Sequence, residues 1–230
     1  MDRRDFIGAA GASALALFHG GEAGAQGPGR LPERNEVRVA FLLGDQANVI
    51  DTFGPWEVFQ DTQVPGLFGR SNPFRLYTVG PDRDPVRMTG GLTVLPRHTI
   101  GDAPPPHLIV VPAQTATDAA RDWLKAASAE ADVTLSICTG AFQLARAGLL
   151  DGLRATTHHQ FWDSFARQFP GVDLHRGLRF IDNGRIATAG GLTSGIDLAL
   201  HIVQRYYGPE VAAATAAYME YAGEGWRTPA

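Results

Sequence analysis

The chain's single cysteine, Cys138, lies in the stretch SICTGAFQLARAGLL, where an apolar run meets a predicted helix. A sharp turn between a buried strand and a helix would present its sulfur above a sheet, in position for nucleophilic attack. The helix N-terminus that Thr139 and Gly140 open would lower the pKa of the thiol. Free cysteines are also among the residues most often buried in cores. Residue type and position therefore leave Cys138 open to either role.

The adjacent histidines His158 and His159 are the next residues that could do chemistry. They lie in the segment RATTHH, 154–159, which we interpret as a strand, and neighbouring residues of a strand point to opposite faces. They therefore cannot converge on one ion, and a single cysteine excludes multi-cysteine zinc and iron–sulfur sites. We expect no metal and no cofactor. We place His158 beside the cysteine, with a structural contact as plausible as a chemical role.

The glycine-rich segment TAGGLTSG, 188–195, precedes a predicted helix and could suggest a phosphate-binding loop. It lacks the lysine of a P-loop, and it comes late in the chain instead of after the first strand. The pattern favours a close-packed turn.

The elements that must position these residues alternate between strand and helix. Fully apolar runs predict buried strands, and apolar residues at helical spacing predict amphipathic helices. The expected strands cover 36–43, 74–80, 107–113 and 132–137, with a ribbon in 85–100 and a hairpin in 178–190. The expected helices lie within 44–60, 117–129, 139–150, 161–169, 193–208 and 209–221. This alternation predicts an open α/β fold in three layers, with a mostly parallel sheet and helices on both faces. Ligands bind such sheets at the carboxyl ends of the strands, where Cys138 is expected.

The N-terminus has the pattern of an export signal. Arg3 and Arg4 precede Asp5-Phe6-Ile7 and a short apolar run, and small residues around 23–25 form a cleavage pattern. The paired arginines resemble a twin-arginine signal, although an unstructured basic terminus is the alternative. We expect a signal peptide over 1–25, a linker over 26–35, one domain over 36–226, a tail over 227–230 and a periplasmic location.

The composition excludes several classes of partner. The 230 residues are 44% hydrophobic and 19% charged, with a formal net charge of −4 and no basic cluster. These values fit one globular domain and argue against nucleic acid or anionic membranes as partners. Beyond the signal no stretch approaches the length of a membrane helix. We expect a small-molecule substrate.

Three separated segments resemble the ThiJ/PfpI superfamily. They are SICTGAFQLARAGLLDGLRATTHH, NVIDTFGPWEVF and IATAGGLTSGIDLALHIV, and the resemblance extends from about Val37 to Tyr221. It implies a flavodoxin-like fold shared with class I glutamine amidotransferases, with Cys138 as the reactive residue. It also implies that Asp51, at the start of the first helix, hydrogen-bonds the sulfur and transfers a proton to the substrate. From the residues alone, a helix N-cap is the alternative for Asp51.

The residue after the cysteine separates branches of this superfamily. Family peptidases have a histidine there, whereas Thr139 cannot act as a base at neutral pH. Threonine matches isocyanide hydratases and the amidotransferase-like domains of AraC-type regulators. The regulators carry a helix-turn-helix region after this domain, and we expect none here because the chain ends at Ala230 and resembles an exported protein. One departure is Ala113-Gln114 after Pro112, where the family commonly has two glycines that help bind negative charge.

The resemblance therefore implies a cofactor-free hydratase that converts an isocyanide into an N-substituted formamide. Cys138 would form a thioimidate, Asp51 would supply the proton, and the Thr139 amide would line the site. The substrate-binding residues would be Ala113, Gln114, Gly140 and His158. A homodimer is also implied. The alternatives are a glyoxalase- or deglycase-type activity on methylglyoxal, and a noncatalytic periplasmic ligand-binding or redox-stress protein in which Cys138 is oxidised.

Overall fold

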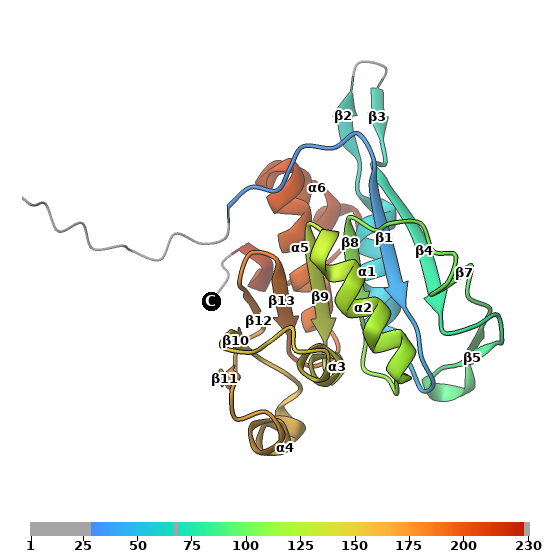
Figure 1. Cartoon of the computed structure of the whole chain (residues 1–230). Helices are drawn as coiled ribbons and strands as arrows, with labels where there is room; N and C mark the ends of the chain where they lie inside the picture. The colour runs from blue at the N-terminus through green and yellow to red at the C-terminus, as the bar shows by residue number, and fades with distance from the viewer. Residues whose placement is uncertain (1–28, 67–68, 228–230) are drawn as a thin grey trace, which may run out of the picture.

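The computed structural model describes residues 29–66 and 69–227 of the chain. The expected signal peptide over 1–25, the first part of the expected linker and the last three tail residues lie outside the described residues. Seven strands form the main sheet, in the order β12-β13-β9-β8-β1-β4-β7 (Figure 1). Every neighbouring pair is parallel except the hairpin of β12 with β13. These strands are β1 Val37–Leu42, β4 Phe74–Gly80, β7 His98–Thr99, β8 Leu108–Val111, β9 Val133–Ile137, β12 Phe180–Asp182 and β13 Ile186–Ala189.

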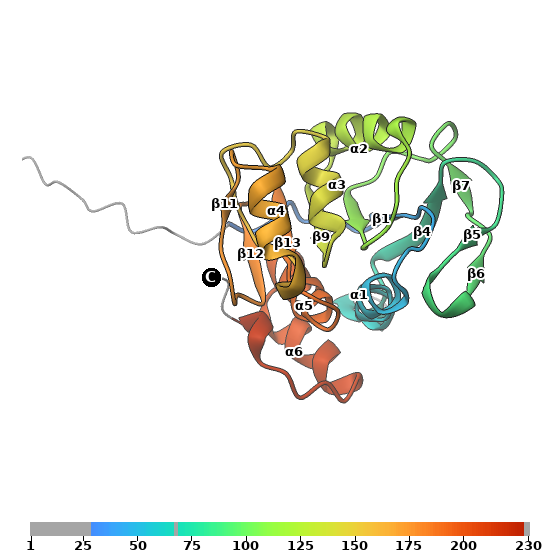
Figure 2. The same ribbon diagram turned by 90° about the horizontal axis from the view of Figure 1, so that it is seen from below.

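Helices cover both faces of the sheet, as Figure 2 shows. Side chains of β1 alternate between two cores: Val39 and Phe41 pack with α1, α5 and α6, whereas Ala40 and Leu42 pack with α2 and α3. This alternation follows from the period of two along a strand. The helices are α1 Val49–Asp61, α2 Asp118–Glu130, α3 Gly140–Arg146, α4 Trp162–Gln168, α5 Ser194–Tyr207 and α6 Pro209–Tyr218. The expected three-layer α/β architecture of flavodoxin-like type is confirmed.

The expected strand over 154–159 is wrong beyond its first two residues. Only Arg154–Ala155 form a strand, β10, which pairs in parallel with β11, Asp173–Leu174, outside the main sheet. The Thr156 amide then donates to Thr188 Oγ1 at 2.9 Å, and the chain turns into a short 3₁₀ helix, His159–Phe161. Side-chain hydrogen bonds thus replace the ladder that would have continued the strand.

The other differences concern short elements. The ribbon expected in 85–100 forms between β5, Val86–Arg87, and β6, Thr93–Val94, around a 3₁₀ turn at Thr89–Gly91. A second ribbon that was not expected joins β2, Val64–Gly66, to β3, Gly69–Ser71. A final 3₁₀ turn covers Gly225–Arg227. Helix α3 ends at Arg146, four residues earlier than expected, because Gly148 adopts a left-handed conformation with a φ of +72°.

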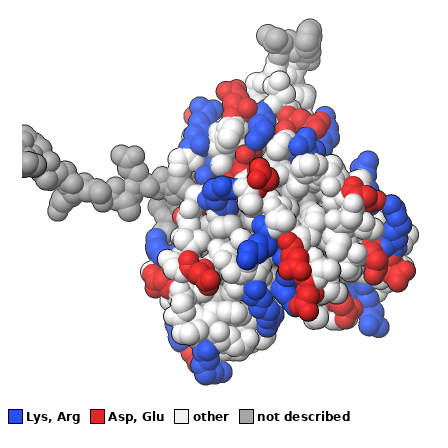
Figure 3. All heavy atoms as spheres, viewed as in Figure 1, with Lys and Arg blue, Asp and Glu red and all other residues white. Residues whose placement is uncertain are grey.

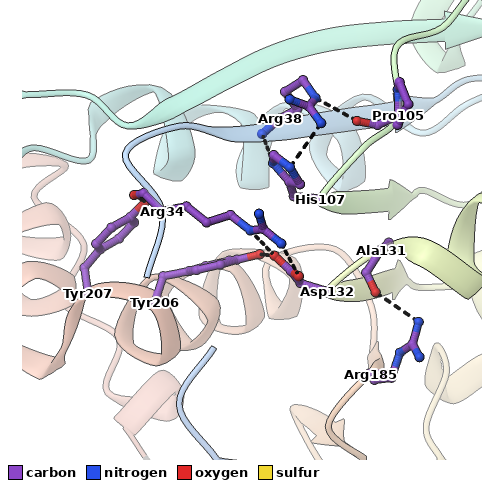
Figure 4. A network of polar contacts seen from close by, with 9 residues as sticks. All are labelled: Arg34, Arg38, Pro105, His107, Ala131, Asp132, Arg185, Tyr206 and Tyr207. Atoms are coloured by element: carbon purple, nitrogen blue, oxygen red, sulfur yellow. Dashed lines mark hydrogen bonds and ion pairs between the residues drawn. The ribbon is translucent and has the colours of Figure 1, made fainter. Parts of the chain in front are cut away.

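The described part of the expected linker is held against the domain. Leu31 is buried, and its amide donates to the carbonyl of Arg205 at 2.9 Å. Arg34 binds both carboxylate oxygens of Asp132 at 2.7 and 2.8 Å, and the Tyr206 hydroxyl donates to the same carboxylate at 2.9 Å (Figure 4). Because Asp132 directly precedes β9, this network fixes residues 29–35 at the end of the sheet where the parallel strands begin.

Charges of both signs are interspersed over the face shown in Figure 3. In 29–66 and 69–227, no helix is long and apolar enough to cross a membrane.

Candidate active site

Cys138 occupies the turn between β9 and α3, at the carboxyl end of the central strands. Its backbone is left-handed, with a φ of +57°, which is unusual for a residue other than glycine. Hydrogen bonds hold this turn from two sides: the Cys138 amide donates to the carbonyl of Gly190 at 2.7 Å, and its carbonyl accepts from Thr157 Oγ1 at 2.8 Å. The expected strand-to-helix elbow is therefore present. The cysteine is 7% exposed.

Gly140 allows α3 to start directly against the end of β8. A Cβ at this position would lie 2.2 Å from the carbonyl oxygen of Val111 and 2.9 Å from that of Pro112. Both obstacles are backbone atoms, so no side-chain rotation could relieve the clash. The structure thus gives Gly140 a packing role that sets the height of Cys138 above the sheet.

We expect Gly140→Ala to lower the free energy of unfolding by about 1–3 kcal/mol, the usual cost of overpacking. Urea denaturation would measure this change. Gly101→Ala is the matched control, because the nearest atom to its added Cβ is Thr99 Oγ1 at 3.6 Å, an ordinary contact. Equal stabilities of the two variants would contradict the packing role of Gly140.

Asp51 lies in the first turn of α1 and is fully buried. The N-cap of this helix is Asn48, whose Oδ1 accepts from the amides of Ile50 and Asp51 at 3.1 and 3.3 Å. The alternative of Asp51 as an N-cap is therefore wrong. Its Oδ2 accepts from the Ala113 amide at 3.2 Å. The Cys138 thiol and the Leu192 amide also face the carboxyl group closely enough to lower its pKa, although Oδ1 has no partner at full hydrogen-bond geometry.

Burial dominates the protonation of both groups. It raises the pKa of Asp51 to about 7, against the opposing effect of the Ala113 amide and of the Cys138 thiol. Burial, and next the negative charge of Asp51, raise the pKa of the Cys138 thiol to about 12, although the amide and hydroxyl of Thr139 favour the thiolate. The Thr139 amide at the start of the helix lowers the thiol pKa, as expected, but desolvation is the larger effect and the pKa is raised overall. The carboxyl group of Asp51 therefore loses its proton at a lower pH than the thiol of Cys138.

Ala113 and Gln114, in the loop after β8, have different partners. The Ala113 amide is engaged by Asp51, so this residue positions the carboxyl group. The side chain of Gln114 turns back toward β1, where Nε2 donates to the carbonyl of Leu42 at 2.9 Å. The carbonyl of Gln114 accepts from Gln143 Nε2 at 2.9 Å. The peptide of Gln114 thus lies beside the site while its side chain points away from it.

The two histidines lie side by side, contrary to the strand argument, because they follow the short strand β10. Their rings stack with centroids 4.4 Å apart. His158 packs against Gly191, where an added Cβ would lie 2.3 Å from the imidazole Cδ2. Burial, and next the charge of His159, lower the pKa of His158, which favours a neutral ring. Across the described residues, no group of three or more His, Cys, Asp or Glu side chains is placed to hold a metal ion.

Sequence reasoning missed Leu192, whose backbone contributes to the site. It lies between β13 and α5 with a φ of +54°, and its amide faces Asp51. The segment TAGGLTSG is the close-packed turn that was expected: Gly195 approaches Ile137, and the carbonyl of Gly190 holds the Cys138 amide. The glycine pair Gly190-Gly191 before a helix indicated tight packing. It gave no sign that the following amide, that of Leu192, would face the carboxyl group of Asp51.

Two cavities adjoin the turn that carries Cys138. One, of about 270 Å³, lies beside Thr139 and is lined also by Gln114, Phe142, Gln143, Arg146 and Phe161. The other, of about 380 Å³, lies beyond the 190–194 loop and is lined by Thr157, His158, Trp162, Arg179 and Leu192. Small molecules therefore have room on either side of the elbow.

Known proteins share both this sequence and this fold. The isonitrile hydratase of Pseudomonas putida is 31% identical over 194 residues, which cover 81% of this chain and 79% of the relative. The HTH-type transcriptional regulator GbdR of Pseudomonas aeruginosa is 30% identical over 193 residues, which cover 81% of this chain and 52% of the regulator. The chain therefore spans about half the length of that regulator.

Solved structures agree with the fold. A ThiJ/PfpI family protein from Pseudomonas syringae superposes with a TM-score of 0.72 at 24% identity, covering 84% of this chain and 78% of that one. Drosophila melanogaster DJ-1beta superposes with a TM-score of 0.68 at 15% identity, covering 82% of this chain and all of the other. The model of the DJ-1/PfpI family matches residues 37–205. This match and the hydratase relative together show that the chain belongs to the DJ-1/PfpI family.

Proposed function

We propose that the protein is a cysteine-dependent, cofactor-free hydratase that converts a small isocyanide into an N-substituted formamide. One observation carries the proposal: the Cys138 thiol and the Asp51 carboxyl group face each other in a buried site, and burial raises the pKa of both groups. A thiol beside a carboxyl group of pKa about 7 can lose its proton to that group and recover it within one catalytic cycle. The hydratase relative supports this choice of reaction.

In the first half of the reaction, Cys138 adds to the terminal carbon of R–N≡C. A C–S bond forms, and the thiol proton, received by Asp51, passes to the same carbon. The product is the thioimidate Cys138–S–CH=N–R. The amide and hydroxyl of Thr139, which favour the thiolate, lie where they would stabilise the sulfur as it attacks. Covalent catalysis suits this substrate because it divides a difficult hydration into two easier additions.

In the second half, water adds to the thioimidate carbon. A C–O bond forms, one proton of the water reaches the nitrogen, and Asp51 relays it. The C–S bond of this tetrahedral adduct then breaks, and the remaining hydroxyl proton returns to the thiol. The formamide R–NH–CHO leaves, and the pair regains its single proton. Asp51 therefore acts in both halves, alternately as base and as acid.

The same geometry disfavours the redox-stress alternative. Oxidation-sensing cysteines are accessible and have a low pKa, because the thiolate is the form that reacts with oxidants. Cys138 is 7% exposed, and burial raises the pKa of its thiol to about 12. A substrate bound beside Asp51 can react as the carboxylate removes the thiol proton, whereas an oxidant in solution reacts only with thiolate that is already present.

A substrate panel tests the proposal. The purified protein is incubated separately with phenyl isocyanide, methylglyoxal and a peptide, and products are followed by chromatography and mass spectrometry. We expect phenylformamide from the isocyanide and no cleavage of the peptide. Consumption of methylglyoxal without formamide production would instead support the glyoxalase-type alternative. Turnover of none of the three would favour a noncatalytic ligand-binding protein.

We also propose that residues 1–25 direct the protein to the periplasm through the twin-arginine route. In a fusion of residues 1–30 to a reporter, replacing Arg3-Arg4 by Lys-Lys should retain the reporter in the cytoplasm, because that route recognises the arginine pair. Fractionation of cells would measure the distribution. Secretion that is unaltered by the replacement would overturn the assignment.

A further inference from the structure

The cavity beside Thr139 takes no part in the proton transfers described above, yet it opens next to them. It measures about 270 Å³, below the range of about 300–1,000 Å³ that is typical of pockets for drug-sized ligands. Thr139 belongs both to this cavity and to the surroundings of the Cys138 sulfur. A group bound here would therefore be one residue away from the reacting atom.

The cavity is lined by both aromatic and polar side chains. Phe142 and Phe161, whose rings lie 6.3 Å apart, are its aromatic lining residues. Gln143, Arg146 and Ser164 are among its polar lining residues. Arg146 is the charged residue among those that line the cavity, and its guanidinium lies 5.7 Å from the centre of the Phe142 ring. The cavity therefore has a positive charge over an aromatic floor.

Two arginines on neighbouring segments have carboxylate partners, which Arg146 lacks in the part of the chain that the structure describes. On the neighbouring helix α2, Arg121 pairs with Asp118. Near α4, Arg176 pairs with Asp163 at 2.6 Å. Within the described residues Arg146 forms no ion pair with a carboxylate, so its charge is left for an anion that enters the cavity.

The back of the cavity is fixed by hydrogen bonds. Gln143 is 3% exposed, its Nε2 donates to the carbonyl of Gln114, and its Oε1 accepts from Arg121 at 3.4 Å. The acceptor on Gln114 is its backbone carbonyl, while its side chain is bound to the carbonyl of Leu42 in β1. A rigid wall facing an unpaired guanidinium favours one small ligand shape over others.

We propose that this cavity is an anion subsite, in which Arg146 binds a carboxylate carried by the substrate. Arg146 is exposed, and its guanidinium can form paired, charge-assisted hydrogen bonds with a carboxylate. The substrate class is then a small isocyanide that bears a carboxylate. That class rests on the proposed function, whereas the anion subsite itself does not.

Alkylation of Cys138 tests the subsite without any turnover. Iodoacetate and iodoacetamide react with the same thiol and differ by one negative charge, so the ratio of their rates cancels changes in the thiolate fraction. Arg146→Ala should lower this ratio about 10- to 100-fold, the usual effect of losing a charge-assisted hydrogen bond. Arg146→Lys should restore part of it.

Arg167→Ala is the matched control, since Arg167 is exposed at the end of α4 and does not line the cavity. It removes the same charge and should leave the ratio unchanged. A ratio unchanged in Arg146→Ala, or an equal fall in Arg167→Ala, would overturn the subsite.

Turnover then tests the substrate class. Isocyanoacetate should be preferred over 2-isocyanoacetamide in kcat/KM, and Arg146→Ala should reduce this preference about 10- to 100-fold, mainly through KM. If both compounds are hydrated without preference, the substrate class fails while the proposed function stands. If neither is hydrated but the alkylation ratio falls in Arg146→Ala, the proposed function fails and the anion subsite stands.

Discussion

Replacing Cys138 by serine is expected to reduce isocyanide hydration about 10³-fold or more, while the protein remains folded. Loss of a covalent nucleophile typically removes most of an enzyme's rate enhancement. A serine hydroxyl is a far weaker acid than a thiol, and a carboxyl group of pKa about 7 cannot take its proton effectively. The change is nearly isosteric, so two backbone hydrogen bonds of this residue should persist: the one its amide donates to Gly190 and the one its carbonyl accepts from Thr157.

Steady-state kinetics and thermal unfolding of wild type and Cys138→Ser measure the two parts of this prediction. Cys138→Ala is a useful second variant, because it removes the hydroxyl that could replace part of the thiol's hydrogen bonding. A variant that folds normally and retains a tenth of the wild-type rate would exclude Cys138 as the nucleophile.

Asp51→Asn is expected to lower kcat/KM about 10²- to 10⁴-fold and to remove its pH dependence near neutrality. In the wild type the rate should rise with pH through about 7, because the carboxylate must accept the thiol proton and burial raises the pKa of Asp51 to about 7. Asparagine neither accepts nor releases that proton, so the variant's profile should be flat there. A wild-type profile centred near pH 4 would contradict the assignment.

The same residue predicts an opposite trend in stability. Because the pKa of Asp51 is raised on folding, its favourable contribution is complete below its unfolded pKa and is lost as the pH rises through about 7. A shift of this size corresponds to at most about 4 kcal/mol. Relative to Asp51→Asn, the wild type should therefore lose stability between pH 4 and pH 8, as urea unfolding would show. Glu57→Gln, on the exposed part of the same helix, should show no such trend.

The buried strands and the turn that carries Cys138 could be predicted from the sequence alone. Leu108–Val111 is apolar throughout, and Val37–Leu42 is apolar except for Arg38, because helices cover both faces of a parallel sheet; that pattern is visible without coordinates. The elbow at Cys138 followed from the direct passage of a buried strand into a helix. At these positions the local sequence pattern agrees with the fold, so each strand or turn could be inferred from residues adjacent to it in the sequence.

The protonation of the site could not be inferred in this way. The high pKa of the Cys138 thiol depends on burial and on Asp51, which lies 87 positions earlier in the chain. Ala113, which was expected among the substrate-binding residues, donates its amide to Asp51, and the Leu192 amide also faces that carboxyl group. These relations form only where the first turn of α1 meets the three strand-to-helix loops that carry Ala113, Cys138 and Leu192, which no local pattern encodes. The prediction that the rings of His158 and His159 point apart was wrong for a related reason. The strand that was to separate them ends at Ala155, three residues before His158.

The docking of residues 29–35 has a practical meaning for how the molecule is handled. Arg34 is fixed at Asp132, before β9 begins, whereas the thiol lies after β9 ends, and a five-residue strand is about 17 Å long. A purification tag or carrier protein joined ahead of residue 29 thus departs from the end of the molecule opposite the reactive sulfur. Tagged and untagged preparations should consume substrate at the same rate, and a surface coupled through that end would present the thiol outward.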